Sequence, residues 1–76
     1  MITTTEDLRI NQLVECARMA DMLKQWQVKT DILTLIGSLV FGYAWRDDRV
    51  EMIADTLEPT EENLPLHSAL MEMIIR

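Results

Sequence analysis

The longest apolar stretch of the chain, residues 32–45, is the feature that most constrains the fold. Its only interruptions are two hydroxyl residues and two glycines, Gly37 and Gly42. The stretch is shorter than the roughly 20 residues that a helix needs to cross a bilayer, so we expect no membrane insertion. A helix over residues 31–45 is apolar nearly all round, which is typical of a helix covered on several sides. We therefore expect it at the centre of a helical domain, with the two glycines allowing neighbouring backbones to approach closely.

The N-terminal segment predicts a longer helix, over about residues 5–28. At 3.6 residues per turn its apolar side chains fill more than half of the circumference, whereas an ordinary surface helix has an apolar stripe about 100° wide. Thr3 and Glu6 have the spacing of a capping box, which marks the start of this helix. A face this broad is more than one neighbouring helix covers, so we expect the helix to contact more than one element.

Two shorter helices follow, over about residues 48–58 and 64–75. Asp48 is the expected N-cap of the first of them. Pro59 ends that helix, and Pro65 lies early in the next one, where its missing N–H has no intrahelical partner to lose. No segment predicts a strand. Apolar residues at helical spacing form the expected core stripes of the two helices: Val50, Ile53, Ala54 and Leu57 in the first, and Leu66, Ala69, Leu70, Met73 and Ile74 in the second.

The helix over residues 31–45 and the last helix match each other at an offset of 34 residues, the period of the tetratricopeptide helix–turn–helix repeat. Ile32 corresponds to Leu66, and Ile36 corresponds to Leu70. Any two amphipathic helices align at some offset, so chance explains the match equally well. The predicted fold is a single all-α domain over residues 1–76, with three to four short helices: a long N-terminal helix and a tetratricopeptide-like helix–turn–helix hairpin.

The small size of the chain limits the folding stability that its own core can provide. A domain of 76 residues is near the lower limit for folding alone, because it buries only about 60% of its unfolded surface. Cys16 is the only cysteine and His67 the only histidine, so the chain has neither an internal disulfide nor a Cys/His set for a structural zinc. Contact with another chain is the remaining way to gain stability.

Charge narrows the choice of partner. The formal net charge of −6 opposes binding to nucleic acid and to anionic membrane surfaces. The segment Met1–Asp7 lacks a basic region followed by an apolar stretch, so no secretory signal is predicted. A lone thiol and no signal favour a cytoplasmic location.

The sequence offers little for catalysis. Cys16 lies on the apolar arc of the first helix, where we expect a buried, inert thiol. His67 falls off the core stripe of the last helix, where we expect a solvated ring. The acidic residues Glu58, Glu61 and Glu62 surround Pro59 as a loop, without the spacing of a calcium site. No phosphate-binding loop or metalloprotease motif occurs. We therefore expect a protein that is not an enzyme, with no catalytic residues, cofactor or metal.

A surplus of apolar side chains favours a protein-binding function. Met22 lies within the polar strip of the first helix, and Phe41 and Trp45 share a face of the helix over residues 31–45. Six methionines suit an adaptable binding surface, because the thioether side chain repacks easily. The alternative is that these residues complete a small core or the interface of a homodimer. The predicted partner-binding residues are Met19, Met22, Leu23, Trp26, Phe41, Trp45, Met71 and Ile75.

The stretch Ile32–Trp45 followed by Arg49–Leu57 resembles the small tetratricopeptide-like chaperones of bacterial type III secretion systems. Those proteins carry an apolar, glycine-containing helix, a short polar turn, and a helix that ends in a leucine before a loop. The resemblance covers about residues 30–75. It implies a face that clamps the amphipathic C-terminal helix of a needle subunit, preventing premature polymerisation, and a second small helical co-chaperone. On this resemblance Phe41, Trp45, Met71 and Ile75 contact the needle subunit.

Two other classes of function remain open from the residues alone. A helical inhibitor encoded by a phage or plasmid can have the same size, charge and helix content. Such inhibitors often mimic nucleic acid, but the acidic residues here are expected to be scattered. The other class is a homodimeric structural or regulatory helical bundle.

Overall fold

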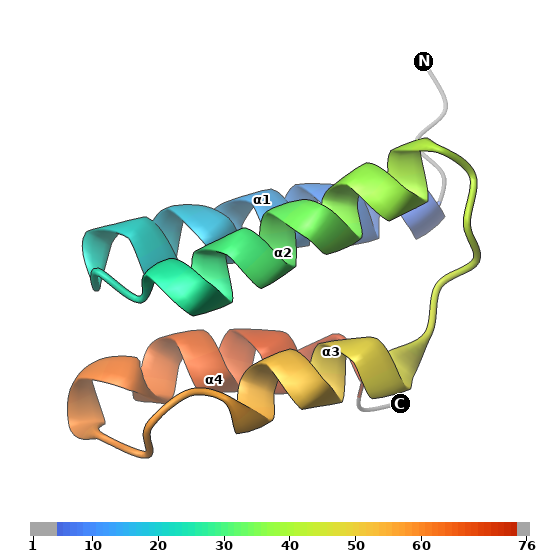
Figure 1. Ribbon diagram of the computed structural model, residues 1–76. Coiled ribbons are helices and arrows are strands. Elements are labelled where there is room, and N and C mark those ends of the chain that lie inside the picture. The colour runs from blue at the N-terminus through green and yellow to red at the C-terminus, as the bar shows by residue number, and fades with distance from the viewer. Residues whose placement is uncertain (1–4, 75–76) are drawn as a thin grey trace.

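The computed structural model describes residues 5–74, and this part of the chain is all-α, as predicted (Figure 1). It contains no strand. Four α-helices and one 3₁₀ turn follow one another along it: α1 (Thr5–Met22), α2 (Trp26–Val40), α3 (Asp47–Asp55), η1 (Glu61–Asn63) and α4 (Leu64–Glu72).

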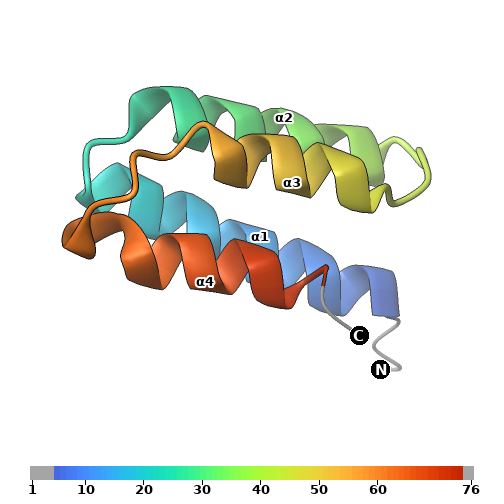
Figure 2. The ribbon, with the colours of Figure 1, turned by 90° about the horizontal axis from the view of Figure 1, so that it is seen from below.

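Successive helices run in opposite directions and close into a ring. Helix α1 contacts α2 and α4, and helix α3 contacts α2 and α4, whereas the described residues give no contact across either diagonal. Figure 1 shows the α1/α2 pair above the α3/α4 pair, and Figure 2, turned by 90°, shows α2 beside α3 and α1 beside α4. The arrangement is that of a four-helix bundle with up-down-up-down topology.

One apolar core fills the centre of the ring, and every α-helix contributes to it. The fully buried side chains include Leu13 of α1, Ile32 and Leu35 of α2, Val50 of α3 and Leu66 of α4. The predicted core stripe of α3 is confirmed. The predicted core stripe of α4 is confirmed as well. Its buried members are Leu66, Leu70 and Met73, and Ala69 and Ile74 are partly buried against the core.

The first helix ends six residues earlier than the sequence predicted, at Met22 in place of Val28. Lys24 adopts the left-handed conformation with φ of 59°. The N–H of Gln25 donates to the carbonyl of Ala20 (2.8 Å), and the N–H of Lys24 donates to that of Asp21 (3.1 Å). These two bonds form a Schellman motif, which reverses the chain into α2. The motif usually carries glycine at the left-handed position. Because this chain has a lysine there, the sequence gave no indication that the helix ends at this point.

The second helix was predicted over residues 31–45, and it spans Trp26–Val40. A second Schellman motif ends it: Gly42 has φ of 100°, and the N–H of Tyr43 donates to the carbonyl of Ser38 (3.1 Å). The prediction that Phe41 and Trp45 share a face of this helix is therefore wrong, because both follow its last residue.

The two glycines do not serve close backbone approach either. A Cβ built at Gly37 or at Gly42 would meet nothing within 4 Å. Gly42 is required by its left-handed backbone, and Gly37 lies on a side of α2 that no described element covers.

The ends of the last two helices also differ from the prediction. Arg46 is the N-cap of α3 in place of Asp48. Asp48 lies in the first turn, where its carboxylate forms an ion pair with the guanidinium of Arg46 (2.7 Å). Helix α3 ends at Asp55, three residues before the predicted end. Thr60 caps η1 by accepting a hydrogen bond from the N–H of Asn63 (3.3 Å), and α4 begins at Leu64 as predicted. Helix α4 ends at Glu72, three residues before the predicted end at residue 75. The predicted capping box of Thr3 and Glu6 lies outside the described backbone or side chains.

Candidate protein-binding surface

Helix α2 carries apolar side chains on the side that faces away from the core. Trp26, Leu33 and Val40, which we call the α2 stripe, are spaced seven residues apart and are 56%, 49% and 70% exposed. Residues at this spacing lie on one face of a helix. The expectation that α2 is central and covered on several sides is therefore wrong. In a ring of four helices each helix covers only the inner side of its neighbours, and the outer side of α2 stays bare.

A groove of about 460 Å³ runs along the outer side of the α1/α2 pair. Across it, the ammonium of Lys29 in α2 lies 2.8 Å from a carboxylate oxygen of Asp21 in α1. The same ammonium lies 5.8 Å from the ring centroid of Trp26, within the range of a cation–π contact. The groove is lined by the apolar residues Val14, Ala17, Met22 and Leu33 and by the charged residues Arg18, Asp21 and Lys29.

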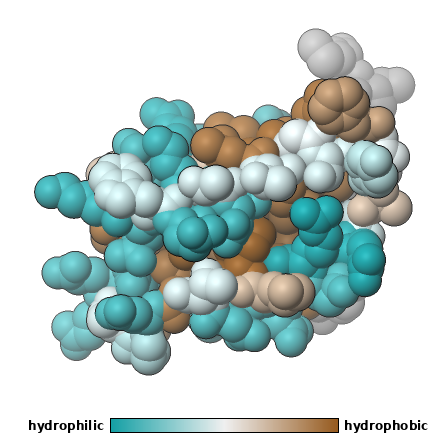
Figure 3. All heavy atoms as spheres, viewed as in Figure 1, coloured by the Kyte–Doolittle hydropathy of each residue, from teal (hydrophilic) through white to brown (hydrophobic). Residues whose placement is uncertain are grey.

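The apolar surface continues past the C-terminal end of α2. Phe41 is 88% exposed, and Tyr43, two residues further along the chain, is exposed as well. Figure 3 shows hydrophobic atoms along the upper edge of this view, over α2 and the segment that follows it, and others in its centre between the two helix pairs. Exposed aromatic side chains of this kind are the usual energetic anchors of protein interfaces.

Trp45, also predicted to bind a partner, is held by contacts within the molecule. Its indole N–H donates to a carboxylate oxygen of Asp47 at 2.6 Å. The guanidinium carbon of Arg9 lies 4.5 Å from the ring centroid. The side chain is partly buried and packs against the core. Trp45 thus ties the start of α1 to the connection between α2 and α3.

The predicted partner-binding residues therefore divide into three groups. Met22, Trp26 and Phe41 are exposed on the α1/α2 pair or just beyond it. Met19, Leu23 and Met71 are partly buried and pack against the core, like Trp45. Ile75 lies outside the described residues. The prediction missed four exposed apolar residues on or beside the same surface: Val14, Leu33, Val40 and Tyr43. The seven-residue spacing from Trp26 was the signal that could have found Leu33 and Val40.

The negative charge is concentrated in one half of the chain. Residues 1–45 contain five acidic and four basic residues, whereas residues 46–76 contain eight acidic and three basic ones. Asp48, Glu51 and Asp55 are all exposed along α3, and their spacing places them on one face of that helix. The expectation that the acidic residues are scattered holds for the other five of the 13, which lie in residues 1–45. Eight of the 13 acidic residues thus belong to the half of the chain that forms α3 and α4, whereas Asp21 lines the groove of α1 and α2.

The two residue types most associated with catalysis do not form a site. Cys16 is buried as predicted, and its burial, followed by the nearby carboxylate of Glu15, raises the pKa of its thiol to about 11. A thiol with so high a pKa stays protonated and unreactive near neutral pH. His67 is partly buried, not fully solvated as expected, and lines a hollow with Asp55 and Leu57. No three His, Cys, Asp or Glu side chains within residues 5–74 are grouped to hold a metal ion.

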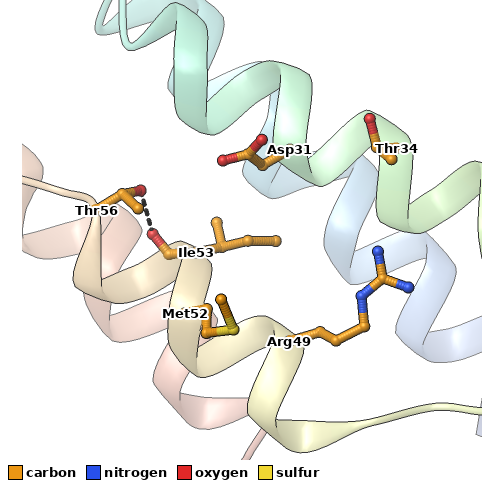
Figure 4. A pocket seen from close by; sticks show the side chains of 6 residues that line it. All are labelled: Asp31, Thr34, Arg49, Met52, Ile53 and Thr56. Carbon is orange, nitrogen blue, oxygen red and sulfur yellow. Dashed lines mark hydrogen bonds between the residues drawn. The ribbon is translucent and has the colours of Figure 1, made fainter.

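A smaller hollow of about 240 Å³ separates α2 from α3 (Figure 4). Its two hydroxyls already donate within their own helices, that of Thr34 to the carbonyl of Thr30 (2.9 Å) and that of Thr56 to the carbonyl of Ile53 (2.7 Å). Arg49 and Asp31 extend into the hollow from opposite sides, so their charges cancel there. It offers a partner less apolar surface than the groove of α1 and α2, and we assign it no function.

Comparison with known proteins adds no relative: no family model, no curated protein and no solved structure matches this chain. The resemblance to type III secretion chaperones thus stays a prediction. None of the helices within residues 5–74 combines the length and the apolar character that crossing a membrane requires.

Proposed function

We propose that this protein is a protein-binding module that accepts an amphipathic helix of another protein along the outer groove of α1 and α2. The observation that supports this most is the α2 stripe, because Trp26, Leu33 and Val40 extend an apolar face over about four turns of a helix whose opposite side forms the core. An amphipathic helix placed in such a groove buries its own apolar face, because its apolar residues at helical spacing contact the groove.

Aromatic residues at the two ends of α2 supply anchors of the kind that such binding uses. Trp26 lies at the N-terminal end of α2, and Phe41 follows its C-terminal end. A helix of 15 residues between them is about 22 Å long, which matches an opposing helix of about four turns. Met22 adds an adaptable contact at the Trp26 end.

The narrower form of this proposal is a cytoplasmic chaperone of type III secretion. It is supported by the resemblance of residues 30–75 to that family and by the exposed apolar groove. In this form the bound helix belongs to a needle subunit, whose assembly surface the chaperone covers until export. A co-chaperone then covers part of the remaining apolar surface. Co-expression with a needle subunit tests this form, because only a true client gains solubility from the wild-type chain and loses it with Leu33→Asp.

The broader proposal is tested by site-specific cross-linking in cells. A photoreactive residue at position 33 in the groove is compared with one at position 55, on the acidic side of α3. We expect position 33 to cross-link to another protein through one segment with apolar residues at helical spacing. A synthetic peptide of that segment should bind the wild-type chain with micromolar affinity and bind Leu33→Asp at least tenfold more weakly. Cross-links from position 55 but none from position 33 would contradict the proposal.

A second candidate function, an inhibitor that mimics nucleic acid, is favoured by the acidic row of Asp48, Glu51 and Asp55. Regularly spaced carboxylates attract the basic groove of a nucleic-acid enzyme, as phosphates do. The same cross-linking experiment separates the two functions. A partner lost on changing these three residues to lysine, but retained with Leu33→Asp, supports the inhibitor.

A further inference from the structure

The geometry points to a second copy of this chain as the resting occupant of the groove: two α2 helices pack antiparallel about a two-fold axis near Leu33. This inference uses the surface of the proposed function but concerns the protein alone. Sedimentation of the purified chain tests self-association, whereas cross-linking in cells tests binding to another protein, so each can fail independently of the other. Contiguous exposed apolar patches mark interaction sites, because burying them removes apolar surface from water. A second copy of the chain is always available to bury this one.

The α2 stripe is symmetric about its middle residue. Trp26 lies seven residues before Leu33, and Val40 lies seven residues after it. In an antiparallel pair related by a two-fold axis, each contact occurs twice. Leu33 then meets Leu33 of the second copy, and Trp26 meets Val40 of the second copy. A repeat of seven residues is also the period at which two helices keep one seam in contact.

The two halves of the stripe are complementary in shape. Trp26 places a large indole in the first half, 56% exposed. The second half holds Gly37 between Leu33 and Val40 on the same face, and the space over Gly37 is open, with nothing within 4 Å of a Cβ built there. Antiparallel packing sets the indole of one copy over Val40 of the other, about one turn from the low surface at Gly37. Parallel packing sets indole against indole and leaves the glycines facing each other across a gap.

Charge favours this face over any other for self-association. Each chain has a net charge of −6, so contact through the acidic side repels. The half of the chain that holds α1 and α2, residues 1–45, has five acidic and four basic residues. The charged residues along the groove are paired as well, Lys29 with Asp21 at 2.8 Å and Arg18 with Glu15 at 3.5 Å. Two copies that meet through α1 and α2 keep their acidic α3/α4 sides apart.

The face supplies a substantial part of the area that a standard dimer interface buries. A pair of helices with a shorter member of 15 residues is about 22 Å long. At an interaxial distance of about 9 Å the pair is about 20 Å wide. Its outer face therefore has a projected area of about 440 Å², somewhat more than half of the roughly 800 Å² that each partner buries in a standard interface.

Sedimentation equilibrium of the purified chain tests the inference. We expect the wild type to sediment at twice its mass of 8.8 kDa at micromolar concentrations. Leu33→Asp should weaken the association at least tenfold, because two carboxylates then face each other at the axis. Met52→Asp is the matched control: Met52 is an exposed apolar residue of α3, and its replacement should leave the dimer intact. Circular dichroism of both variants verifies that the helices are retained.

A wild type that remains monomeric at all concentrations would overturn the inference, as would a dimer that Met52→Asp disrupts and Leu33→Asp does not. Cysteine cross-linking then tests the orientation. Leu33→Cys should form a disulfide with itself, and Trp26→Cys should form one only when mixed with Val40→Cys. Self-linking of Trp26→Cys at the rate of Leu33→Cys would show a parallel pair and contradict the antiparallel arrangement. The native Cys16 is buried and does not compete.

Discussion

Arg9 of α1 stacks its guanidinium over the indole of Trp45, 4.5 Å from the ring centroid, and so joins the first helix to the connection between α2 and α3. The indole N–H is held by Asp47 at the start of α3. One aromatic side chain thus connects the two helix pairs at the end of the bundle where their connection crosses. A half-buried aromatic in this position stabilises the fold more than an exposed one presented to a partner.

Replacing Trp45 should therefore destabilise the bundle, whereas replacing Phe41 should not. We expect Trp45→Ala to lower the free energy of unfolding by about 2–3 kcal/mol, since it loses packing, the hydrogen bond and the cation–π contact. Phe41 is 88% exposed, so Phe41→Ala should change stability by less than about 0.5 kcal/mol. Urea unfolding at matched protein concentration measures both. Equal effects of the two variants would contradict the internal role of Trp45.

The turn between α1 and α2 should be open to stabilisation. Lys24 has φ of 59°, a conformation in which a Cβ costs about 1–2 kcal/mol. Lys24→Gly removes this strain but gives the unfolded chain more freedom, so we expect a net gain of about 0.5–1 kcal/mol. Thermal unfolding measures it as a higher Tm. The matched control is Gln25→Gly, where φ is −91° and no strain is relieved, so that variant should have a lower Tm.

The reverse change at the other Schellman motif should be unfavourable. Gly42 has φ of 100°, which side chains of L-residues rarely adopt. We expect Gly42→Ala to lower the free energy of unfolding by about 1–2 kcal/mol. Gly37 has an ordinary helical backbone and open space around its Cβ position, so Gly37→Ala should raise monomer stability by about 1 kcal/mol. Opposite signs for the two glycines, measured by urea unfolding of dilute protein, distinguish a backbone requirement from simple helix propensity.

Helical periodicity predicted which residues form the core but not where α1 ends. The spacing of Val50, Ile53 and Ala54 indicates one buried face, and the structure buries it. The apolar pattern continues without a break through Leu23, Trp26 and Val28, so periodicity alone placed all three in the first helix. The left-handed residue that divides this run is a lysine, and only the tertiary arrangement selects that conformation.

The candidate site was harder to predict for a related reason. A segment that is apolar nearly all round does not show which side faces the core. Leu33 and Leu35 are alike in the sequence, yet Leu35 is buried and Leu33 is half exposed. The distinction arises from the position of α2 between α1 and α3 in the ring. By contrast, Met22 interrupts a polar strip, and that local contrast was enough to identify it as a surface residue.

Stability should fall at high pH because of Cys16. Burial raises the pKa of its thiol to about 11 from an ordinary value of 9.0. Between these two pH values the thiol ionises in the unfolded chain but keeps its proton in the native chain. Ionisation therefore lowers the free energy of the unfolded state alone, and the free energy of unfolding falls. We expect wild-type stability to decline from about pH 9 to pH 11 by up to about 2 kcal/mol more than that of Cys16→Ala. Urea unfolding of both proteins across this range measures the difference, which removes every contribution that the two proteins share. Parallel declines would show that the thiol ionises as easily in the native state.

Lys29 limits how apolar the groove is, and its replacement should strengthen binding there without a large change in fold stability. The side chain crosses from α2 to Asp21 of α1, but the ion pair is solvent-exposed enough that it contributes about 0–1 kcal/mol. Lys29→Met keeps most of the aliphatic stem and removes a charge from the seam between Trp26 and Leu33, where a polar residue lowers the stability of helix association. We expect a change in the free energy of unfolding of the monomer within about 0.5 kcal/mol and self-association about tenfold tighter, measured by sedimentation. Lys24→Met, an equal change of charge at the turn outside the groove, is the control that should leave association unaltered. Tighter association of both variants would attribute the effect to net charge; tighter association of Lys29→Met alone would attribute it to the groove.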